Sequence, residues 1–316
     1  MSRMPTWTID DIPSQHGRTA IVTGGTEGVG FEIARALLNA GGRVIVAARD
    51  PGKGARAVNR IGAGTAIENV RFEVLDLADR SSIIAFADRT RVQLDTVDLL
   101  INNAGIMAPA RRRTTVDGFE LQFGLNVLGH FLLTGLLLPL LRAGSDSRVV
   151  TLSSIASRDG MIDFDDLQST RRYRPMTAYA QSKLGNLMFA LELERRSVDA
   201  GWGIESYAVH PGLARTNLFA AGPGSISSLA LIRRVMGPLV FQSAAKGALS
   251  TLFAATSEVA VPGSYYGPRR LGEIRGPVGL AKVPVQALDP DVSARLWTVA
   301  EELTGFTWQR ASHSPV

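Results

Sequence analysis

The chain has 316 residues, of which 45% are hydrophobic and 20% charged, and it contains no cysteine. This length suffices for one large α/β domain or two small ones, and the lack of cysteine excludes disulfides, thiolate metal sites and a cysteine nucleophile. Lysine and arginine exceed aspartate and glutamate by 34 − 29 = 5 residues, which suits an anionic ligand such as a phosphorylated cofactor.

Short β-rich runs alternate with helical stretches from residue 19 onward. The β-rich runs predict strands at 19–24, 43–49, 70–76, 97–105, 148–154 and 204–212. The longest stretches between them predict three helices: one over 28–42, one that ends at about Leu141, and one over 177–200. Continuous apolar strands separated by helices indicate a parallel sheet covered on both faces. We therefore predict an α/β fold with a doubly wound parallel sheet (a Rossmann fold), whose ligands bind beyond the carboxyl ends of the strands.

No Pro/Gly/Ser-rich linker interrupts this order before residue 212, so residues 1–316 are predicted to form a single domain with a core at about 17–260. Residues 213–242 are rich in Gly, Ser and Leu and are interpreted as a flexible substrate loop. Residues 261–316 form a C-terminal extension with a possible last strand, "SYYG", and a capped terminal helix. The glycine- and proline-rich run 269–284 fits no element.

Several classes of protein are disfavoured. The first residues show no signal peptide, and the most apolar run, Phe131–Leu141, is too short for the about 20 residues that span a bilayer. We expect no membrane anchor and a cytoplasmic location. The four histidines have no metal-ligand spacing, so no metal site is predicted. The arginine runs 111–113 and 171–172 lack interleaved aromatics, so they are interpreted as solvated loops and no nucleic-acid partner is expected.

The first predicted strand leads directly into the glycine-rich turn "TGGTEGVG" at the start of a helix. Glycines at such a turn let a diphosphate approach the backbone, and the helix N-terminus offers N–H groups and partial positive charge. This context favours a dinucleotide site over an ordinary turn. Its candidate cofactor-binding residues are Thr23, Gly24, Thr26, Gly28, Val29 and Gly30.

The end of the second strand bears on which dinucleotide binds. An acid there takes ribose hydroxyls, whereas an arginine accommodates a 2′-phosphate. Arg49 follows the strand at once, so NADP(H) is favoured, and NAD(H) remains the alternative because Asp50 is adjacent and Glu27 lies within the glycine turn.

The stretch "AYAQSK" places Tyr179 four residues before Lys183. On a helix such residues lie one above the other, so both side chains can point at one spot. A free phenol titrates near 10, and a cation beside it would stabilise the phenolate and lower its pKa. The spacing alone does not distinguish a catalytic pair from two neighbours on a helix.

The chain resembles the short-chain dehydrogenase/reductases over at least residues 19–260. The glycine turn (23–30), "NNAG" (102–105), "SS" (153–154), "YAQSK" (179–183) and "HPG" (210–212) occur in that family's order. The segments 115–141 and 163–189 are similar to those of the retinol dehydrogenase branch.

The resemblance implies a catalytic set of Asn126, Ser154, Tyr179 and Lys183. Tyr179 would be the acid/base, Lys183 its activating cation and a ribose contact, and Asn126 the holder of a water for proton relay. Ser154 would steady the substrate oxygen. Ser153 is the neighbouring candidate, because successive strand residues point to opposite faces.

The resemblance also implies further cofactor contacts. Asp76 and Leu77 would contact the adenine. The 102–105 segment, with Asn103, Ala104 and Gly105, would pack beside the adenosine half of the cofactor. The turn after the sixth strand, with Pro211, Gly212 and Thr216, would lie around the nicotinamide. His210 is interpreted as a packing residue.

These inferences indicate an NADP-dependent oxidoreductase acting on the alcohol or carbonyl of an apolar small molecule. The alternative is a non-catalytic NADP(H)-binding sensor or scaffold, and a peripheral membrane role is a further possibility for a lipid-soluble substrate. A homo-oligomer, dimer or tetramer, is expected by resemblance, with the long helices as candidate pairing surfaces.

Overall fold

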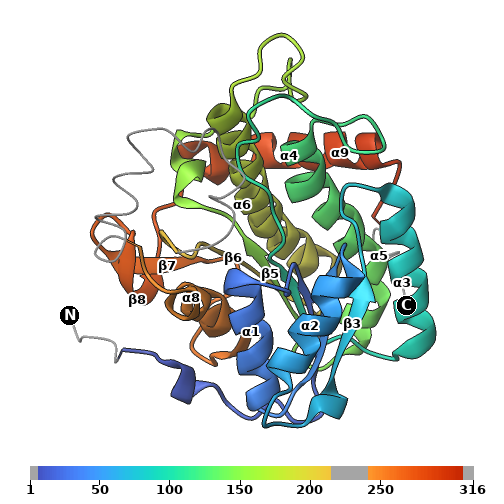
Figure 1. Ribbon diagram of the computed structural model, residues 1–316. Helices are drawn as coiled ribbons and strands as arrows, with labels where there is room; N and C mark the ends of the chain where they lie inside the picture. Colours follow the sequence, from blue (N-terminus) through green and yellow to red (C-terminus); the bar gives the residue numbers. More distant parts are fainter. Residues whose placement is uncertain (1–5, 215–240, 309–316) are drawn as a thin grey trace, which may run out of the picture.

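The described residues of the computed structural model, 6–214 and 241–308, contain one eight-stranded sheet (Figure 1). Its strand order is β3-β2-β1-β4-β5-β6-β7-β8. The strands are β1 (Thr19–Thr23), β2 (Arg43–Ala48), β3 (Val70–Val74), β4 (Leu99–Asn102), β5 (Arg148–Leu152), β6 (Glu205–Val209), β7 (Tyr265–Arg270) and β8 (Arg275–Leu280). The pairings from β3 to β7 are parallel, which confirms the predicted doubly wound sheet. The strand order reverses between β1 and β4, where such sheets bind their ligands.

Helices cover both faces of the sheet. α1 (Gly28–Asn39), α2 (Pro51–Ile61) and α8 (Ala244–Thr256) pack on one face, and α3 (Arg80–Gln93), α5 (Gly129–Ala143) and α6 (Pro175–Ala200) on the other. Successive strand residues enter opposite cores: Ile21 of β1 packs with the second group of helices and Val22 with the first. This alternation explains why the strands read as continuous apolar runs.

The run 269–284 that fitted no element is largely the hairpin of β7 and β8. β8 pairs antiparallel with β7 and carries Pro277. Glycine and proline made this run resemble a loop, but an edge strand tolerates proline because one row of its N–H groups has no ladder partner. The C-terminal part of the chain therefore adds two strands to the sheet beside β6.

The long helix predicted to run through about Leu141 is interrupted near its start. A short α4 (Leu121–Phe123) continues into the π-helix η3 (Gly124–Leu128), and α5 follows. The stretch Leu121–Ala143 is long and apolar enough to cross a membrane, but 94% of its most apolar window is buried inside the protein. It is a core helix, and Asn126 is a buried residue of its π-helical turn.

The C-terminal helix α9 (Pro290–Thr304) covers the outer side of the α5–α6 layer (Figure 1). The Trp297 ring of α9 lies 4.9 Å from Phe131 of α5 and 5.8 Å from Phe189 of α6. Trp308 completes this aromatic cluster at 4.7 Å from Trp297. The surface on which we expected α5 and α6 to pair with a second copy is therefore occupied, in this region, by the chain's own C-terminal segment. The predicted homo-oligomer stays a prediction.

Most of the predicted substrate loop, 213–242, lies outside the described residues. Its described ends are joined, because Ala214 and Gln242 form a parallel bridge and Gln242 N donates to Leu213 O at 2.9 Å. Gln242 Nε2 also donates to Pro211 O at 2.5 Å. Both ends of the segment thus lie beside Pro211.

Candidate active site

The parallel strands bring the predicted site residues to one edge of the sheet. Each of these residues follows, or lies close to, the carboxyl end of its strand, and these ends all face the same way. The glycine turn follows β1, Arg49 follows β2, Asp76 and Leu77 follow β3, Asn103–Gly105 follow β4, Ser153 and Ser154 follow β5, and Pro211 and Gly212 follow β6.

The glycine turn is held close to the end of β4. Gly28 opens α1 with φ of 62°, a left-handed conformation that favours glycine. A Cβ at Gly30 would lie 2.6 Å from Gly24 O and even closer to the Asn103 amide, so only glycine fits there. Asn103 Nδ2 donates to Thr23 O at 2.7 Å. Val29 is buried in the core, so it can offer a ligand only its backbone.

The two acids near the second strand end are both engaged elsewhere. The Asp50 side chain caps α2 by accepting from Lys53 N at 2.9 Å. Glu27 forms an ion pair with Lys53, with 3.2 Å between Oε1 and Nζ. Arg49 is exposed. Asp50 and Glu27 thus each have a partner within the protein.

The two serines after β5 point to different places. Ser153 is buried, and its hydroxyl donates to Lys183 O at 2.7 Å, which ties β5 to α6. Ser154 caps the short helix η4 (Ile155–Asp159) by accepting from Ala156 N at 3.2 Å, and its side chain is close enough to the phenol of Tyr179 to lower the pKa of that phenol. Ser154 is therefore the serine beside the tyrosine.

Tyr179 and Lys183 lie one helical turn apart on α6, which starts with Pro175 in its first turn. Both are buried, with 6% and 4% of their surface exposed. Lys183 Nζ donates to Leu152 O at 3.0 Å. A Cβ at Gly105 would lie 3.3 Å from both Lys183 Nζ and Asn126 Oδ1, so the β4 loop brings Lys183 and Asn126 to the same place.

The electrostatics of this pair differ from the expectation drawn from sequence. Burial raises the pKa of Tyr179 and the hydrogen bond with Ser154 lowers it less, so the net direction is upward. Burial lowers the pKa of Lys183 to about 8. The charged form of each group is disfavoured because both are removed from water. The net pKa of Tyr179 is therefore raised by burial, although the Lys183 ammonium lies one helical turn away.

Asn126 is fixed by the backbone around Ile106. Its Oδ1 accepts from Ile106 N at 3.0 Å, and its Nδ2 donates to Ile106 O at 3.1 Å and to Ser182 Oγ at 2.9 Å. This amide therefore holds the π-helical turn against the β4 loop and α6.

His130 is a site neighbour that sequence reasoning interpreted only as structural or solvated. Its Nδ1 lies 2.9 Å from Asn126 O and its Nε2 lies 3.0 Å from Thr23 Oγ1. Burial lowers its pKa to about 4, so the ring is neutral and links the first strand to the π-helix. The feature of the sequence that could have indicated this role is the position of His130, four residues and about one helical turn after Asn126.

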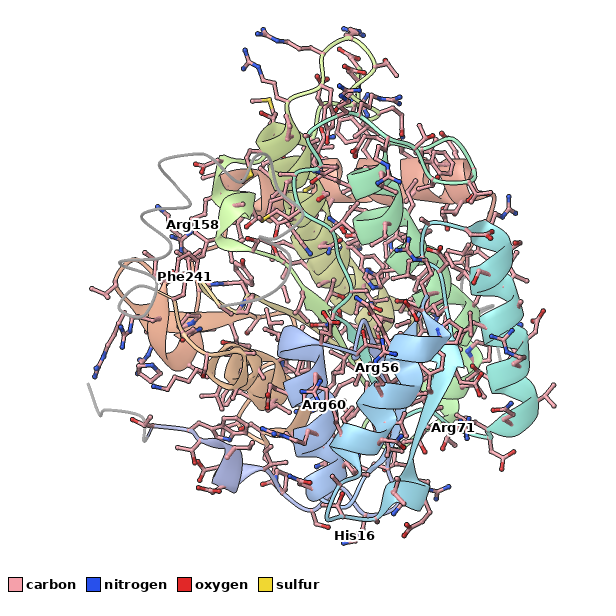
Figure 2. The ribbon with its side chains drawn as sticks, in the orientation of Figure 1. His16, Arg56, Arg60, Arg71, Arg158 and Phe241 are labelled. Atoms are coloured by element: carbon pink, nitrogen blue, oxygen red, sulfur yellow. The ribbon has the colours of Figure 1, made fainter. Side chains whose placement is uncertain are left out.

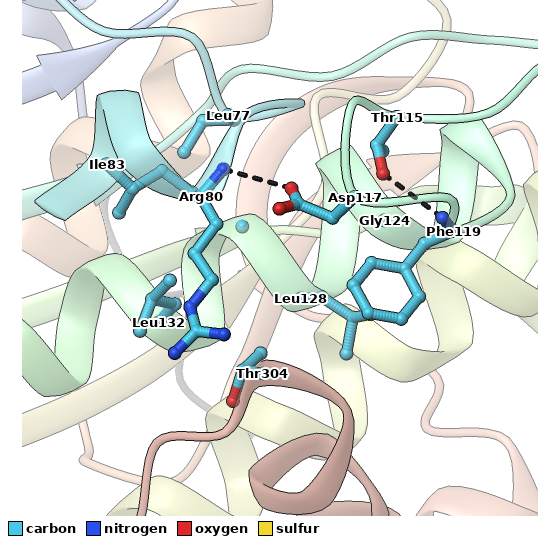
Figure 3. A pocket seen from close by; sticks show the side chains of 11 residues that line it. Leu77, Arg80, Ile83, Thr115, Asp117, Phe119, Gly124, Leu128, Leu132 and Thr304 are labelled. Atoms are coloured by element: carbon cyan, nitrogen blue, oxygen red, sulfur yellow. Dashed lines mark hydrogen bonds between the residues drawn. The ribbon is translucent and has the colours of Figure 1, made fainter.

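The predicted adenine contacts lie next to a separate hollow (Figure 3). Asp76 Oδ1 accepts from Ala78 N at 2.9 Å, and Leu77 is buried. The hollow lies between the start of α3, the 115–119 turn, the π-helix and the end of α9. The turn is tied to α3 by Arg80 N, which donates to Asp117 Oδ2 at 3.0 Å. Leu77 is the only predicted site residue in its lining, so this hollow backs the adenine side and does not contain the Tyr179 site.

The turn after β6 is held by His210. Gly212 N donates to His210 Nδ1 at 3.2 Å, and the ring is fully buried. Thr216, the last predicted cofactor contact, lies outside the described residues.

The sheet, the glycine turn and the buried tyrosine–lysine pair define a Rossmann-fold oxidoreductase, and the sequence model of the short chain dehydrogenases matches residues 18–223. The chain belongs to this family. It is 40% identical to mouse (Mus musculus) retinol dehydrogenase 12 over 93% of its length and 88% of the relative's. It is 39% identical to mouse polyprenol dehydrogenase, covering 93% and 86% of the two chains.

Solved structures show the same fold. An uncharacterized protein from Mycobacterium paratuberculosis superposes with a TM-score of 0.79 at 39% identity, covering 96% of this chain and 99% of that one. Pseudomonas aeruginosa RhlG, solved in an active-site complex with NADP, superposes with a TM-score of 0.64 at 26% identity, covering 80% and 94% of the two chains.

Proposed function

We propose that the protein is an NADP-dependent oxidoreductase that interconverts an apolar alcohol and its carbonyl compound. The proposal is supported above all by the partly exposed Ser154 beside the buried Tyr179 and Lys183, beyond the end of β5. A phenol next to a serine hydroxyl, with an amine one turn away, can hold and transfer one proton at a substrate oxygen.

The residues at the sheet edge fit a dinucleotide. The glycines let the turn pack closely against the end of β4, and α1 begins within the turn at Gly28, so the N–H groups of its first turn would be available to a diphosphate. Arg49 would hold the 2′-phosphate, Asp76 and Leu77 the adenine, and Pro211 and Gly212 the nicotinamide. NADP(H), when bound, supplies or accepts the hydride.

The chain's own residues handle the proton and the substrate oxygen. In reduction, Tyr179 Oη gives its proton to the carbonyl oxygen as negative charge develops there, and Ser154 donates a hydrogen bond to the same oxygen. The raised pKa of Tyr179 keeps this proton in place until the reaction. Lys183, whose pKa is about 8, is mostly protonated at neutral pH and stabilises the phenolate left behind.

The relatives support an apolar substrate. Retinol and polyprenol, the alcohols in their names, are both long isoprenoid alcohols, and the identity extends over more than 90% of this chain. We infer the same class of substrate here.

Incubation of the protein with NADPH and retinal, a polyprenal or an aromatic ketone tests the proposed reaction. We expect loss of absorbance at the nicotinamide band with at least one isoprenoid carbonyl, and alcohol as the product. Binding of NADPH with no oxidation by any of these compounds would instead support the sensor or scaffold alternative. Cell fractionation tests the cytoplasmic location, which stays a prediction.

Arg49 sets the preference between the two dinucleotides in this proposal. Arg49→Leu is expected to weaken NADP⁺ binding by about 10- to 100-fold, because a charge-assisted hydrogen bond to the 2′-phosphate is lost, and to change NAD⁺ binding less than about twofold. Titration of both nucleotides measures this.

Arg43→Leu is the matched control, since Arg43 is an exposed arginine at the opposite end of β2. It should leave both affinities unchanged. If Arg49→Leu lost the same binding affinity for NADP⁺ and for NAD⁺, Arg49 would not be the residue that contacts the 2′-phosphate.

A further inference from the structure

The turn of the β7–β8 hairpin reaches both loops that border the candidate site. Leu213 N, next to the Pro211–Gly212 turn, donates to Ile274 O in the hairpin turn at 3.0 Å. Tyr265 Oη of β7 donates to Ser154 O at 3.1 Å. The hairpin lies outside the 18–223 segment matched by the family model.

Glu273, in the hairpin turn, is bound from three directions. Its Oε2 lies 3.0 Å from His210 Nε2 and forms an ion pair with Arg158, while Oε1 accepts from Lys282 N at 3.0 Å. Burial raises the pKa of Glu273, but the contacts with His210, the Lys282 amide and Arg158 outweigh it, so the net pKa is lowered and the carboxylate is charged. Glu273 has φ of 71°, uncommon for a residue other than glycine, and the surrounding contacts hold it there.

The hydrogen-bond pattern fixes the state of His210. Nδ1 accepts from Gly212 N, so the proton of the neutral ring is on Nε2 and is donated to Glu273. Burial lowers the pKa of His210 more than Glu273 raises it, which agrees with a neutral ring. The Gly212 amide therefore donates to the His210 ring, and the ring in turn donates to the Glu273 carboxylate.

Arg158 connects the same carboxylate to the other loop. It lies in η4, the helix that Ser154 caps, and its Nη1 also donates to Gly272 O at 3.2 Å. Figure 2 shows Arg158 on the side of the molecule where the hairpin lies. One carboxylate thus joins the Gly212 turn, through His210, to the helix that begins at Ser154.

We propose that Glu273 is a positioning residue that fixes the Pro211–Gly212 turn relative to Ser154, and thereby the nicotinamide end of the cofactor relative to the group that binds the substrate oxygen. This inference rests on the proposed function, in which Pro211 and Gly212 hold the nicotinamide. The adenosine end lies beyond β1 to β3 and has no contact with this cluster among the described residues.

The test compares two ligands that differ only in the nicotinamide. NADP⁺ and 2′-monophosphoadenosine 5′-diphosphoribose, which lacks that ring, are titrated into wild-type protein and Glu273→Gln. Glutamine keeps the size of the side chain and removes its charge. We expect NADP⁺ to bind about tenfold more weakly to the variant, and the truncated nucleotide to bind within about twofold of wild type.

Glu205→Gln is the matched control, because Glu205 pairs with Arg148 at 2.9 Å at the opposite end of β6 from His210. It should change neither affinity. If Glu273→Gln does not fold, Arg158→Met, at a side chain 28% exposed, should show the same split. Equal weakening of both ligands, or of neither, would overturn the inference alone. Wild-type protein that binds neither ligand would overturn the proposed function and, with it, this inference.

Discussion

Replacing Tyr179 by phenylalanine is expected to lower turnover about a thousandfold or more while NADP⁺ affinity stays within about twofold of wild type. Phenylalanine fills the same buried space and lacks only the hydroxyl that meets Ser154. Without it, the group beside Ser154 that gives its proton to the substrate oxygen in the proposed mechanism is missing. Steady-state rates with an isoprenoid carbonyl and a cofactor titration on the same preparation measure the two effects.

The control for this variant is Tyr266→Phe. Tyr266 is also a buried tyrosine, but its hydroxyl accepts from Val261 N at 2.8 Å on the far side of β7, away from α6. It should lose some stability and keep its activity. Turnover that survives in Tyr179→Phe at a tenth of the wild-type rate would exclude Tyr179 as the proton donor.

Much of the fold was predictable because parallel strands buried on both faces are short and continuously apolar. β1, β2 and β5 each read that way, and each ends within two residues of the expected place. The first strand of the hairpin was predicted, since "SYYG" overlaps β7, but the second was not, because β8 is an edge strand whose glycines and proline are typical of a turn. The π-helical turn at Asn126 leaves little trace in the sequence pattern, because one extra residue in a turn hardly changes the apolar periodicity.

The positions of the candidate site residues followed from motif order, but their environment did not. Spacing placed Tyr179 and Lys183 on one helical face and could not show that both would be buried, which reverses the expected direction of the Tyr179 pKa. Likewise, His210 was interpreted as a packing residue because its partner Glu273 is 63 residues away in the chain. Long-range contacts of this kind leave no local pattern.

Lys183→Met is expected to abolish turnover and, at the same time, to stabilise the protein. The buried ammonium loses hydration without gaining a carboxylate partner, which is why its pKa falls from 10.5 to about 8. Methionine has a similar length and no charge. Leu152 O keeps a donor, because Asn186 Nδ2 also bonds it at 2.9 Å. From the size of the pKa shift we expect a gain of about 3 kcal/mol in the free energy of unfolding at pH 7.

The pH dependence of stability tests whether the buried charge of Lys183 causes this gain in stability. The folded-state pKa of Lys183 is lower than the unfolded one, so between about pH 8 and 10.5 the unfolded chain holds more protons and wild-type stability gains a rising contribution with pH. This contribution should be missing in Lys183→Met, and the two stabilities should converge toward pH 10.5. Urea unfolding at pH 7 and pH 10 measures it.

Lys246→Met, at an exposed lysine on α8, is the control and should change neither activity nor the pH slope. A Lys183→Met protein less stable than wild type at pH 7 would mean that the ammonium is paired or hydrated in the folded state. The charge that the proposed mechanism needs beside the phenolate would then be present at no cost to folding. In that case burial would not lower the pKa of Lys183.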